Sequence, residues 1–176
     1  FYGISKYVPE QYIMAFADLF GLDYTILRYA NVYGPRQDPK GEAGVVSIFL
    51  KKLIYGETPI IYGDGEQTRD FIYVQDVVKA NIAALTKGSK GIFNISSNTQ
   101  TSINTLLKIM CELLSKKFAA DHKPPRIGDI LHSQLNNKRA MEVLDWQPTY
   151  TIWDGLKEMC FYIKYKENLI LKGDKK

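Results

Sequence analysis

The chain has 176 residues, of which 45% are hydrophobic and 24% are charged. This is the composition of an ordinary globular protein, so disordered, collagen-like and coiled-coil architectures are excluded, and the length suits one domain or slightly more. No apolar run approaches the ~18 residues that a membrane-spanning helix needs. The net charge of +4 comes largely from a basic stretch at 164–176, a solvated tail that does not predict nucleic-acid binding.

Cysteine and histidine are scarce. Cys111 and Cys160 fall on separate predicted helices, and His122 and His132 share one proline-containing loop. Neither pair has the spacing of a zinc site or a disulfide framework, so we predict no metal and a reducing cytoplasmic location. The chain begins with Phe1 and shows no charged-then-apolar leader. We therefore expect no signal peptide, and either an upstream start or a removed segment.

Apolar periodicity predicts helices and strands in alternation along the first half of the chain. A helix at 3–20 precedes a strand at 23–29 and a long loop at 31–44, and a second helix follows at 45–55. The first helix is expected to turn one stripe inward, formed by Val8, Tyr12, Ala15 and Leu19. Short strands at 59–62 and 68–74 flank Gly63-Asp64-Gly65, which predicts a hairpin.

The second half continues the alternation. A helix beginning at Asp76 is followed by a strand at 91–96 and a helix capped by Thr101 or Ser102. A basic loop at 116–125, a short helix at 137–144 and a final helix complete the chain. The expected inward stripes of the three longer helices are Val78, Ile82 and Leu85; Leu106, Met110 and Leu113; and Ile152, Leu156, Met159 and Ile163.

These elements predict an α/β fold in which only the strands at 23–29 and 91–96 belong to a parallel core sheet. Parallel strands need several neighbours and cover on both faces. Two such strands cannot shelter the predicted helices, so we expect the chain to be the later part of a larger fold.

The first motif is Tyr2-Gly3-Ile4-Ser5-Lys6. A tyrosine and a lysine four positions apart lie on the same helix face, where the ammonium group favours the phenolate form of the tyrosine. A single ammonium supplies only part of the required stabilisation, so a second positive group, such as an oxidised nicotinamide ring, would be needed. Taken alone, the same spacing also fits an ordinary helix surface.

Three further motifs carry polar groups. Polar side chains follow a buried strand in the stretch 27–36, which ends Asn31-Val32-Tyr33-Gly34-Pro35-Arg36, and ligands gather at such strand ends in α/β sheets. The stretch 62–76 contains Arg69-Asp70-Phe71, and its Gly63-x-Gly65 is no phosphate loop because no third glycine or helix follows. Arg126 and Asp129 lie in a predicted loop. The plainer alternatives are a simple strand exit, an exposed Arg69–Asp70 ion pair and a solvated Arg126.

The order of these motifs, with Leu144-Asp145-Trp146-Gln147-Pro148 after them, resembles the nucleotide-sugar branch of the extended short-chain dehydrogenases/reductases. The stretch 28–49 looks most like UDP-glucose 4-epimerases, especially Arg36-Gln37-Asp38-Pro39 and residues 41–46. The resemblance extends from about Tyr2 to Leu156. It implies that residues 1–35 end the Rossmann-like domain and that residues 36–176 form the substrate-binding region, with 75–100 returning to the Rossmann-like sheet.

The resemblance also assigns roles to residues. Tyr2 and Lys6 resemble the catalytic pair, which together with Tyr29 meets the nicotinamide end of NAD. Arg69 and Arg126 resemble the arginines that clamp the diphosphate, and a planar guanidinium suits phosphate oxygens. Asn31 and Val45 match positions that contact the sugar nucleotide, and Ile60 and Tyr62 match positions that line the uracil slot. Asp129 matches the residue on the ribose, and Ser133 matches a position near the N-acetyl pocket.

By this resemblance, the parent protein is an NAD-dependent UDP-sugar 4-epimerase that transiently oxidises C4 of UDP-glucose, UDP-galactose or N-acetylhexosamine forms. The chain departs from the family because none of its 13 glycines forms the dinucleotide-binding turn, and the ribose acid and catalytic Ser/Thr are missing. We therefore expect an inactive C-terminal portion of a homodimeric parent. The alternatives are a nucleotide-sugar 4,6-dehydratase or decarboxylase, and a non-catalytic UDP-sugar-binding fragment.

Overall fold

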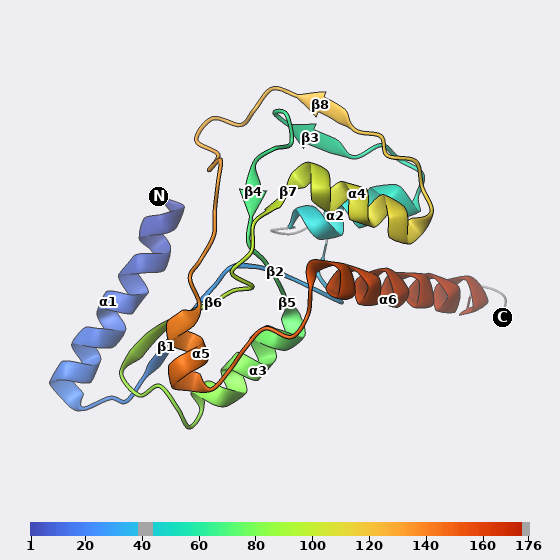
Figure 1. The fold of residues 1–176 in the computed structure, drawn as a ribbon. Helices are drawn as coiled ribbons and strands as arrows, with labels where there is room; N and C mark the ends of the chain where they lie inside the picture. The colour runs from blue at the N-terminus through green and yellow to red at the C-terminus, as the bar shows by residue number, and fades with distance from the viewer. Residues whose placement is uncertain (39–43, 174–176) are drawn as a thin grey trace.

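The computed structural model describes residues 1–38 and 44–173, without the side chains of 165–173 (Figure 1). Helices and runs of one to three short strands are mixed along the chain, as predicted for an α/β fold. In chain order the elements are α1 (Tyr2–Phe20), β1 (Thr25–Tyr29), β2 (Asn31–Tyr33), α2 (Val45–Ile54), β3 (Ile60–Tyr62), β4 (Thr68–Arg69), β5 (Phe71–Tyr73), α3 (Val74–Ala84), β6 (Gly91–Ile95), β7 (Thr101–Ser102), α4 (Ile103–Leu114), β8 (Asp121–Lys123), α5 (Lys138–Leu144) and α6 (Ile152–Gly173).

The strands of the described residues pair two by two. β1 and β6 run parallel with Thr25 opposite Gly91, which confirms the predicted parallel core pair. β2 pairs with β5 and β3 with β8, both in parallel, whereas β4 and β7 are antiparallel. Every pair therefore joins segments that are at least 30 residues apart in sequence, and three of the four pairs join the first half of the chain to the second.

The predicted hairpin around Gly63-Asp64-Gly65 is wrong. β3 leads into this turn and pairs with β8, while the strands after the turn, β4 and β5, pair with β7 and β2. The prediction of a basic, proline-marked loop at 116–125 is therefore wrong at β8, whose residues Asp121, His122 and Lys123 are all exposed. Gly63 and Gly65 do take left-handed backbone conformations, with φ of 80° and 83°, but their turn redirects the chain instead of folding it back on itself.

The predicted loop at 31–44 is also partly wrong. Its first residues form β2, in which Tyr33 is buried and opposite Tyr73 of β5. Its end at 39–43, with the motif residues Pro39 and Gly41 to Ala43, lies outside the described residues. Close packing explains Gly34, since a Cβ there would lie 2.3 Å from Cγ1 of Val74. The Asn-x-Tyr-Gly motif is therefore also a packing motif.

Two hydrophobic clusters form the core of the described residues. The larger one joins β3, β5, α2, α4 and α6, and includes Leu106, Met110, Leu156 and Met159 from the predicted stripes of α4 and α6. The smaller one joins α3, α5 and β6 around Phe93 and Trp146. Figure 1 shows α1, at the blue end, on the far side of the molecule from α6, at the red end. No described helix has the length and apolarity to span a membrane.

The predicted inward stripes of the first and third helices are wrong. In α1 the residues Val8, Tyr12, Ala15 and Leu19 are exposed, and only Ala17 is buried. In α3 the residues Val78, Ile82 and Leu85 are exposed, whereas Asp76, Val77 and Ala80 are buried. Periodicity identifies an apolar face but says nothing about which element covers it. α3 instead packs its small and capping residues inward.

Asp76 joins α3 to the segment before α6 and has no exposed surface. Its carboxylate accepts hydrogen bonds from the Thr149 backbone N (2.9 Å) and hydroxyl (2.7 Å) and from the Tyr150 backbone N (3.0 Å). Lys79 Nζ donates to it as well (3.2 Å). A buried carboxylate is tolerated only when its oxygens are satisfied in this way.

We expect Asp76→Ala to lower the free energy of unfolding by about 3 kcal/mol, because part-buried donors at residues 149 and 150 and the Lys79 ammonium lose their acceptor. Glu142→Ala, which removes an exposed carboxylate paired with Lys138, should cost less than about 0.5 kcal/mol. Urea unfolding followed by tryptophan fluorescence measures both. Equal effects of the two substitutions would contradict this account of Asp76.

Candidate functional site

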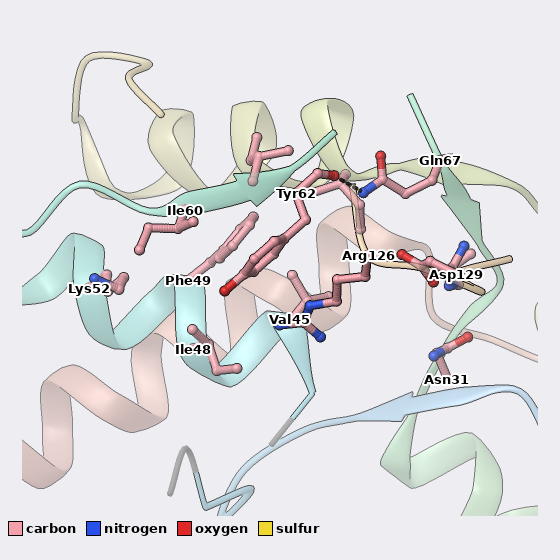
Figure 2. Close-up of a pocket in the computed structure, with 13 residues that line it drawn as sticks. Asn31, Val45, Ile48, Phe49, Lys52, Ile60, Tyr62, Gln67, Arg126 and Asp129 are labelled. Carbon is pink, nitrogen blue, oxygen red and sulfur yellow. Dashed lines mark hydrogen bonds and ion pairs between the residues drawn. The ribbon is translucent and has the colours of Figure 1, made fainter. Parts of the chain in front are cut away.

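A cavity of about 450 Å³ opens between α2, β3 and the loop at 126–129 (Figure 2). This volume lies in the range of small-molecule sites. The structure places every predicted substrate-binding residue except Ser133 on its wall. The lining residues are Asn31, Val45, Ile48, Phe49, Lys52, Ile60, Ile61, Tyr62, Gln67, Arg69, Ile103, Arg126 and Asp129.

One wall of the cavity is a face of α2. Val45, Ile48, Phe49 and Lys52 occupy positions i, i+3, i+4 and i+7, so they share one side of the helix. Only Val45 was predicted from the sequence. The helical spacing from Val45 onward was the signal that could have found the other three.

Gln67 was missed as well, and it acts on the turn beside the cavity. Its Nε2 donates to the backbone oxygen of Tyr62 at 2.8 Å and so joins the end of β3 to the segment before β4. No chemistry of its own marked this glutamine in the sequence, because its partner is a backbone group.

Arg126 lies over the ring of Tyr62, with its Cζ 4.1 Å from the ring centroid. Figure 2 shows this guanidinium extending from the loop into the cavity, between Tyr62 and the start of α2. A guanidinium on an aromatic face gains cation–π attraction and keeps its in-plane N–H groups available for other acceptors. Arg126 is exposed, as the solvated alternative expects, and its guanidinium contacts the Tyr62 ring as well.

Arg69 reaches the same cavity from β4 and is held by the neighbouring loop. Its Nη1 donates to the backbone oxygens of Thr68 (2.8 Å) and Ile130 (2.6 Å), and its Nη2 forms an ion pair with Asp129. The predicted Arg69–Asp70 ion pair is wrong, because Asp70 is buried and turned to other partners. The two arginines thus meet at one site although they lie far apart in sequence.

Positive charge prevails in this cavity. Asp129 balances Arg69, and Glu57 pairs with Lys52 at 3.2 Å, which leaves the Arg126 guanidinium against a neutral ring. The N-terminus of α2 begins at Val45 on the cavity wall, and its partial positive charge also favours an anion. With Ile48, Phe49 and Ile60 beside these groups, the cavity suits a ligand that combines an apolar flat ring with negative charge.

Asn31 and Ser133 lie near this site in different ways. Asn31 lines the cavity close to Asp129 in Figure 2, and its backbone N donates to the Asp70 oxygen at 2.8 Å. Ser133 is half-buried and is not part of the wall; its backbone N donates to the oxygen of Thr68 at 3.2 Å. Ser133 therefore stands next to β4, behind Arg69.

The predicted catalytic pair lies outside the cavity, on α1. Lys6 Nζ is 5.2 Å from the centroid of the Tyr2 ring, so the two side chains do share one helix face. Tyr2 is 71% exposed. Tyr29, at the end of β1, is 46% exposed and donates its hydroxyl to Asn81 Oδ1 at 2.9 Å. The pair is thus formed on a helix with little cover.

A bidentate ion pair fastens α1 to β1. Arg28 Nε donates to Glu10 Oε1 at 2.8 Å, and its Nη2 donates to Oε2. The hydrogen bonds from Arg28 lower the pKa of Glu10. Since only Ala17 of α1 is buried, this pair is a main link between the helix that carries Tyr2 and the sheet. No group of three or more His, Cys, Asp or Glu side chains suited to a metal occurs in the described part of the chain.

Comparison with known proteins identifies the family. The model of the "NAD dependent epimerase/dehydratase family" matches residues 1–96, which is more than half of the chain. The chain belongs to this family. The matched range includes β1, α1 with Tyr2, β2 with Asn31 and β4 with Arg69. It confirms the resemblance that the motifs indicated.

Individual relatives agree with the family. The crystal structure of UDP-glucose 4-epimerase from Thermotoga maritima, solved with UDP-glucose, is 47% identical with a TM-score of 0.92 over 94% of this chain and 54% of that chain. UDP-glucose 4-epimerase of Mycolicibacterium smegmatis is 39% identical, over 94% of this chain and 53% of its own length. UDP-N-acetyl-alpha-D-glucosaminuronate decarboxylase of Bacillus cytotoxicus is 33% identical, over 95% and 54%. The chain spans about half the length of these relatives.

Lowering the pH should weaken the attachment of α1 to β1 through the Arg28–Glu10 pair. A carboxylate whose pKa is lowered by folding stabilises the fold above its unfolded pKa of 4.5, and this contribution disappears as the pH falls through the folded value. We expect α1 amides to lose exchange protection in that acidic range, after correction for intrinsic rates. Glu10→Gln should remove the same protection at pH 7.

Asp145→Asn is the matched control, since it neutralises an exposed carboxylate that is paired with Lys87. Its α1 amides should exchange as in the unmodified chain. Unchanged protection in Glu10→Gln would show that the Arg28–Glu10 pair does not hold α1. Glu10→Gln should lower the free energy of opening of α1 by less than about 1 kcal/mol, as is usual for ion pairs with solvent access.

Proposed function

We propose that this chain is the C-terminal, substrate-binding portion of an NAD-dependent UDP-sugar 4-epimerase. The observation that carries the proposal is the convergence of Arg69 and Arg126 on one cavity, beside the ring of Tyr62. Two guanidinium groups near an aromatic wall match the charge and shape of a nucleoside diphosphate. The 47% identity to an epimerase solved with UDP-glucose supports the same ligand class.

In this proposal different cavity residues bind different parts of the ligand. Arg69 and Arg126 bind the diphosphate, and Ile60 and Tyr62 flank the uracil ring. A backbone amide at Val45, at the start of α2, meets the nucleotide, while Asp129 contacts the ribose. Asn31 meets the sugar nucleotide. Ser133, beside β4, is the small residue next to the N-acetyl position of an N-acetylhexosamine.

The chemistry is assigned to α1. NAD, when bound, supplies the acceptor and donor of the C4 hydride. Tyr2, as the phenolate, takes the proton of the sugar 4-hydroxyl and returns it after the 4-keto sugar has turned over. Lys6 stabilises the phenolate and holds the nicotinamide ribose, and Tyr29 lies at the nicotinamide end. The contact of Lys6 with the Tyr2 ring fits this assignment.

The same residues provide only part of a cofactor site. A dinucleotide is held mainly by a glycine-rich turn at a helix N-terminus, and none of the 13 glycines forms that motif. We propose that residues 1–35 end a Rossmann-like domain, that 36–176 bind substrate and that 75–100 return to the first domain. We further propose a cytoplasmic homodimer as the parent protein, without nucleic-acid or membrane partners.

The isolated 176-residue chain should therefore not convert UDP-galactose to UDP-glucose in the presence of NAD. The reasons are the missing pyrophosphate turn and the exposure of Tyr2. Product analysis by chromatography measures the conversion, with a full-length family epimerase as the positive control. Conversion at a rate typical of enzymes would refute this prediction.

Binding should survive in the same chain. We expect calorimetry to detect UDP binding, and Arg69→Ala and Arg126→Ala each to weaken it about tenfold or more, since a charge-assisted hydrogen bond contributes ~1.5–3 kcal/mol. Arg139→Ala is the matched control, because Arg139 lies over Phe93 in the other core cluster. Absence of UDP binding, or an equal loss with Arg139→Ala, would contradict the proposed site.

A second candidate is a nucleotide-sugar decarboxylase or 4,6-dehydratase. The 33% identity to a UDP-N-acetyl-alpha-D-glucosaminuronate decarboxylase supports it, because such an enzyme would use the same nucleotide-binding cavity. The two candidates differ in the acid–base residues beside the catalytic Ser/Thr, which these 176 residues do not contain. A third candidate is a non-catalytic UDP-sugar-binding fragment. Such a chain would bind UDP, but no added partner chain would give it catalytic activity.

A further inference from the structure

Asp70 lies directly behind the arginine side of the cavity and is almost fully buried, with 1% of its surface exposed. Its Oδ1 accepts hydrogen bonds from the Ser97 backbone N (2.9 Å) and hydroxyl (2.8 Å). Its Oδ2 accepts one from the Leu135 backbone N at 3.2 Å. The carboxylate therefore bridges the loop after β6 and the segment that follows the cavity loop.

The residues around Asp70 connect it to three parts of the cavity wall. Arg69 precedes it in the chain and turns to the cavity, so the two neighbouring side chains point to opposite sides, as in extended backbone. Asn31 donates its backbone N to the Asp70 backbone oxygen. Leu135 belongs to the same segment as Asp129 and Ile130, which hold the Arg69 guanidinium.

We propose that Asp70 is a positioning residue that sets the separation between Arg69 and Arg126 in the ligand-binding cavity. Thr68 of β4 already bonds the backbone of Leu131 and Ser133. Asp70 adds a second tether, from the Leu135 backbone N through its carboxylate to Ser97. The role in ligand binding rests on the proposed function. The tether itself does not.

The two oxygens of a carboxylate are what this position requires. Three donors converge on it, and a carboxylate accepts from all of them. An asparagine of the same shape can satisfy the two donors of Ser97 with its oxygen, but its NH₂ group then faces the Leu135 N–H. Asp70→Asn therefore selectively removes the tether to the cavity segment while keeping the anchor.

Hydrogen exchange of the whole 176-residue chain tests the tether without any ligand. In Asp70→Asn, the amides of Leu135 and Ser133 should exchange at least ~10-fold faster, because both are hydrogen-bonded in the unmodified chain, whereas the amides of α4 should not change. Ser97→Ala is the matched control: it also removes one hydrogen bond to this carboxylate, but it leaves Leu135 bound. Unchanged exchange at Leu135 and Ser133 in Asp70→Asn, or equal acceleration in Ser97→Ala, would overturn the proposal.

UDP titration then tests the positioning role by a double-mutant cycle. Asp70→Asn should weaken UDP binding about tenfold, and most of this loss should vanish when Arg126 is already alanine. A purely structural role would give the same fold-loss in both backgrounds, which would overturn the proposal. If Asp70→Asn does not fold, Leu135→Pro replaces it, because it deletes the donor and leaves the carboxylate in place. Exchange is then read at the Ser133 amide, since proline has no amide proton.

The two proposals fail separately. If the unmodified chain binds no UDP, the proposed function is contradicted, and the exchange experiment still decides whether Asp70 tethers the segment. If UDP binds and depends on both arginines, while Asp70→Asn has no effect on affinity or exchange, only the positioning role is overturned.

Discussion

The cavity depends on the mutual hold between Arg69 and the segment at 129–130. Arg69 donates to the Ile130 backbone and pairs with Asp129, and the loop before these residues thereby brings Arg126 over Tyr62. Together with the backbone hydrogen bonds that join Thr68 to Leu131 and Ser133, this contact attaches the 126–130 loop to β4. Charge-assisted bonds to a partly buried guanidinium are among the stronger polar contacts in a protein, so a short strand such as β4 can organise a long loop.

The same contact explains why two arginines can face one cavity before any ligand arrives. Like charges at close range are costly unless each is compensated. Asp129 compensates Arg69, whereas Arg126 is compensated only by the face of Tyr62. The unevenness has a consequence for binding: an anionic ligand gains most from Arg126, while Arg69 must share its N–H groups among the ligand, Asp129 and the loop. Asp70, the residue after Arg69, holds the segment that follows the loop by accepting a hydrogen bond from the Leu135 backbone N.

Sequence predicted the fold class and named residues that line one cavity, whereas several details of the packing around them were wrong. The residues that converge on the cavity carry recognisable chemistry in a fixed order, so Arg69, Arg126, Asp129 and Tyr62 could be named in advance. Lys52 and Gln67 could not, since their roles follow from a helix face and a backbone contact. The stripes of α4 and α6 were correct because each helix is covered within the chain. Those of α1 and α3 were wrong, because an apolar stripe specifies a partner surface without showing where that surface is. β8 was missed because its pairing with β3 joins polar, exposed residues.

The proposed ligand-binding residues and the proposed catalytic pair lie on parts of the chain that are packed to different extents. The cavity residues rest on the larger hydrophobic cluster, which is complete among the described residues. The Tyr2–Lys6 pair rests on a helix that buries only Ala17 and leaves Tyr7, Tyr12, Phe16 and Leu19 exposed. Contiguous exposed apolar surface of this kind usually marks a contact face. A ligand held by the arginines could therefore be bound with full geometry while the phenol on α1 still lacked the rigid surroundings that acid–base catalysis requires. This difference in support is the physical reason for expecting UDP affinity and turnover to be separable in this chain.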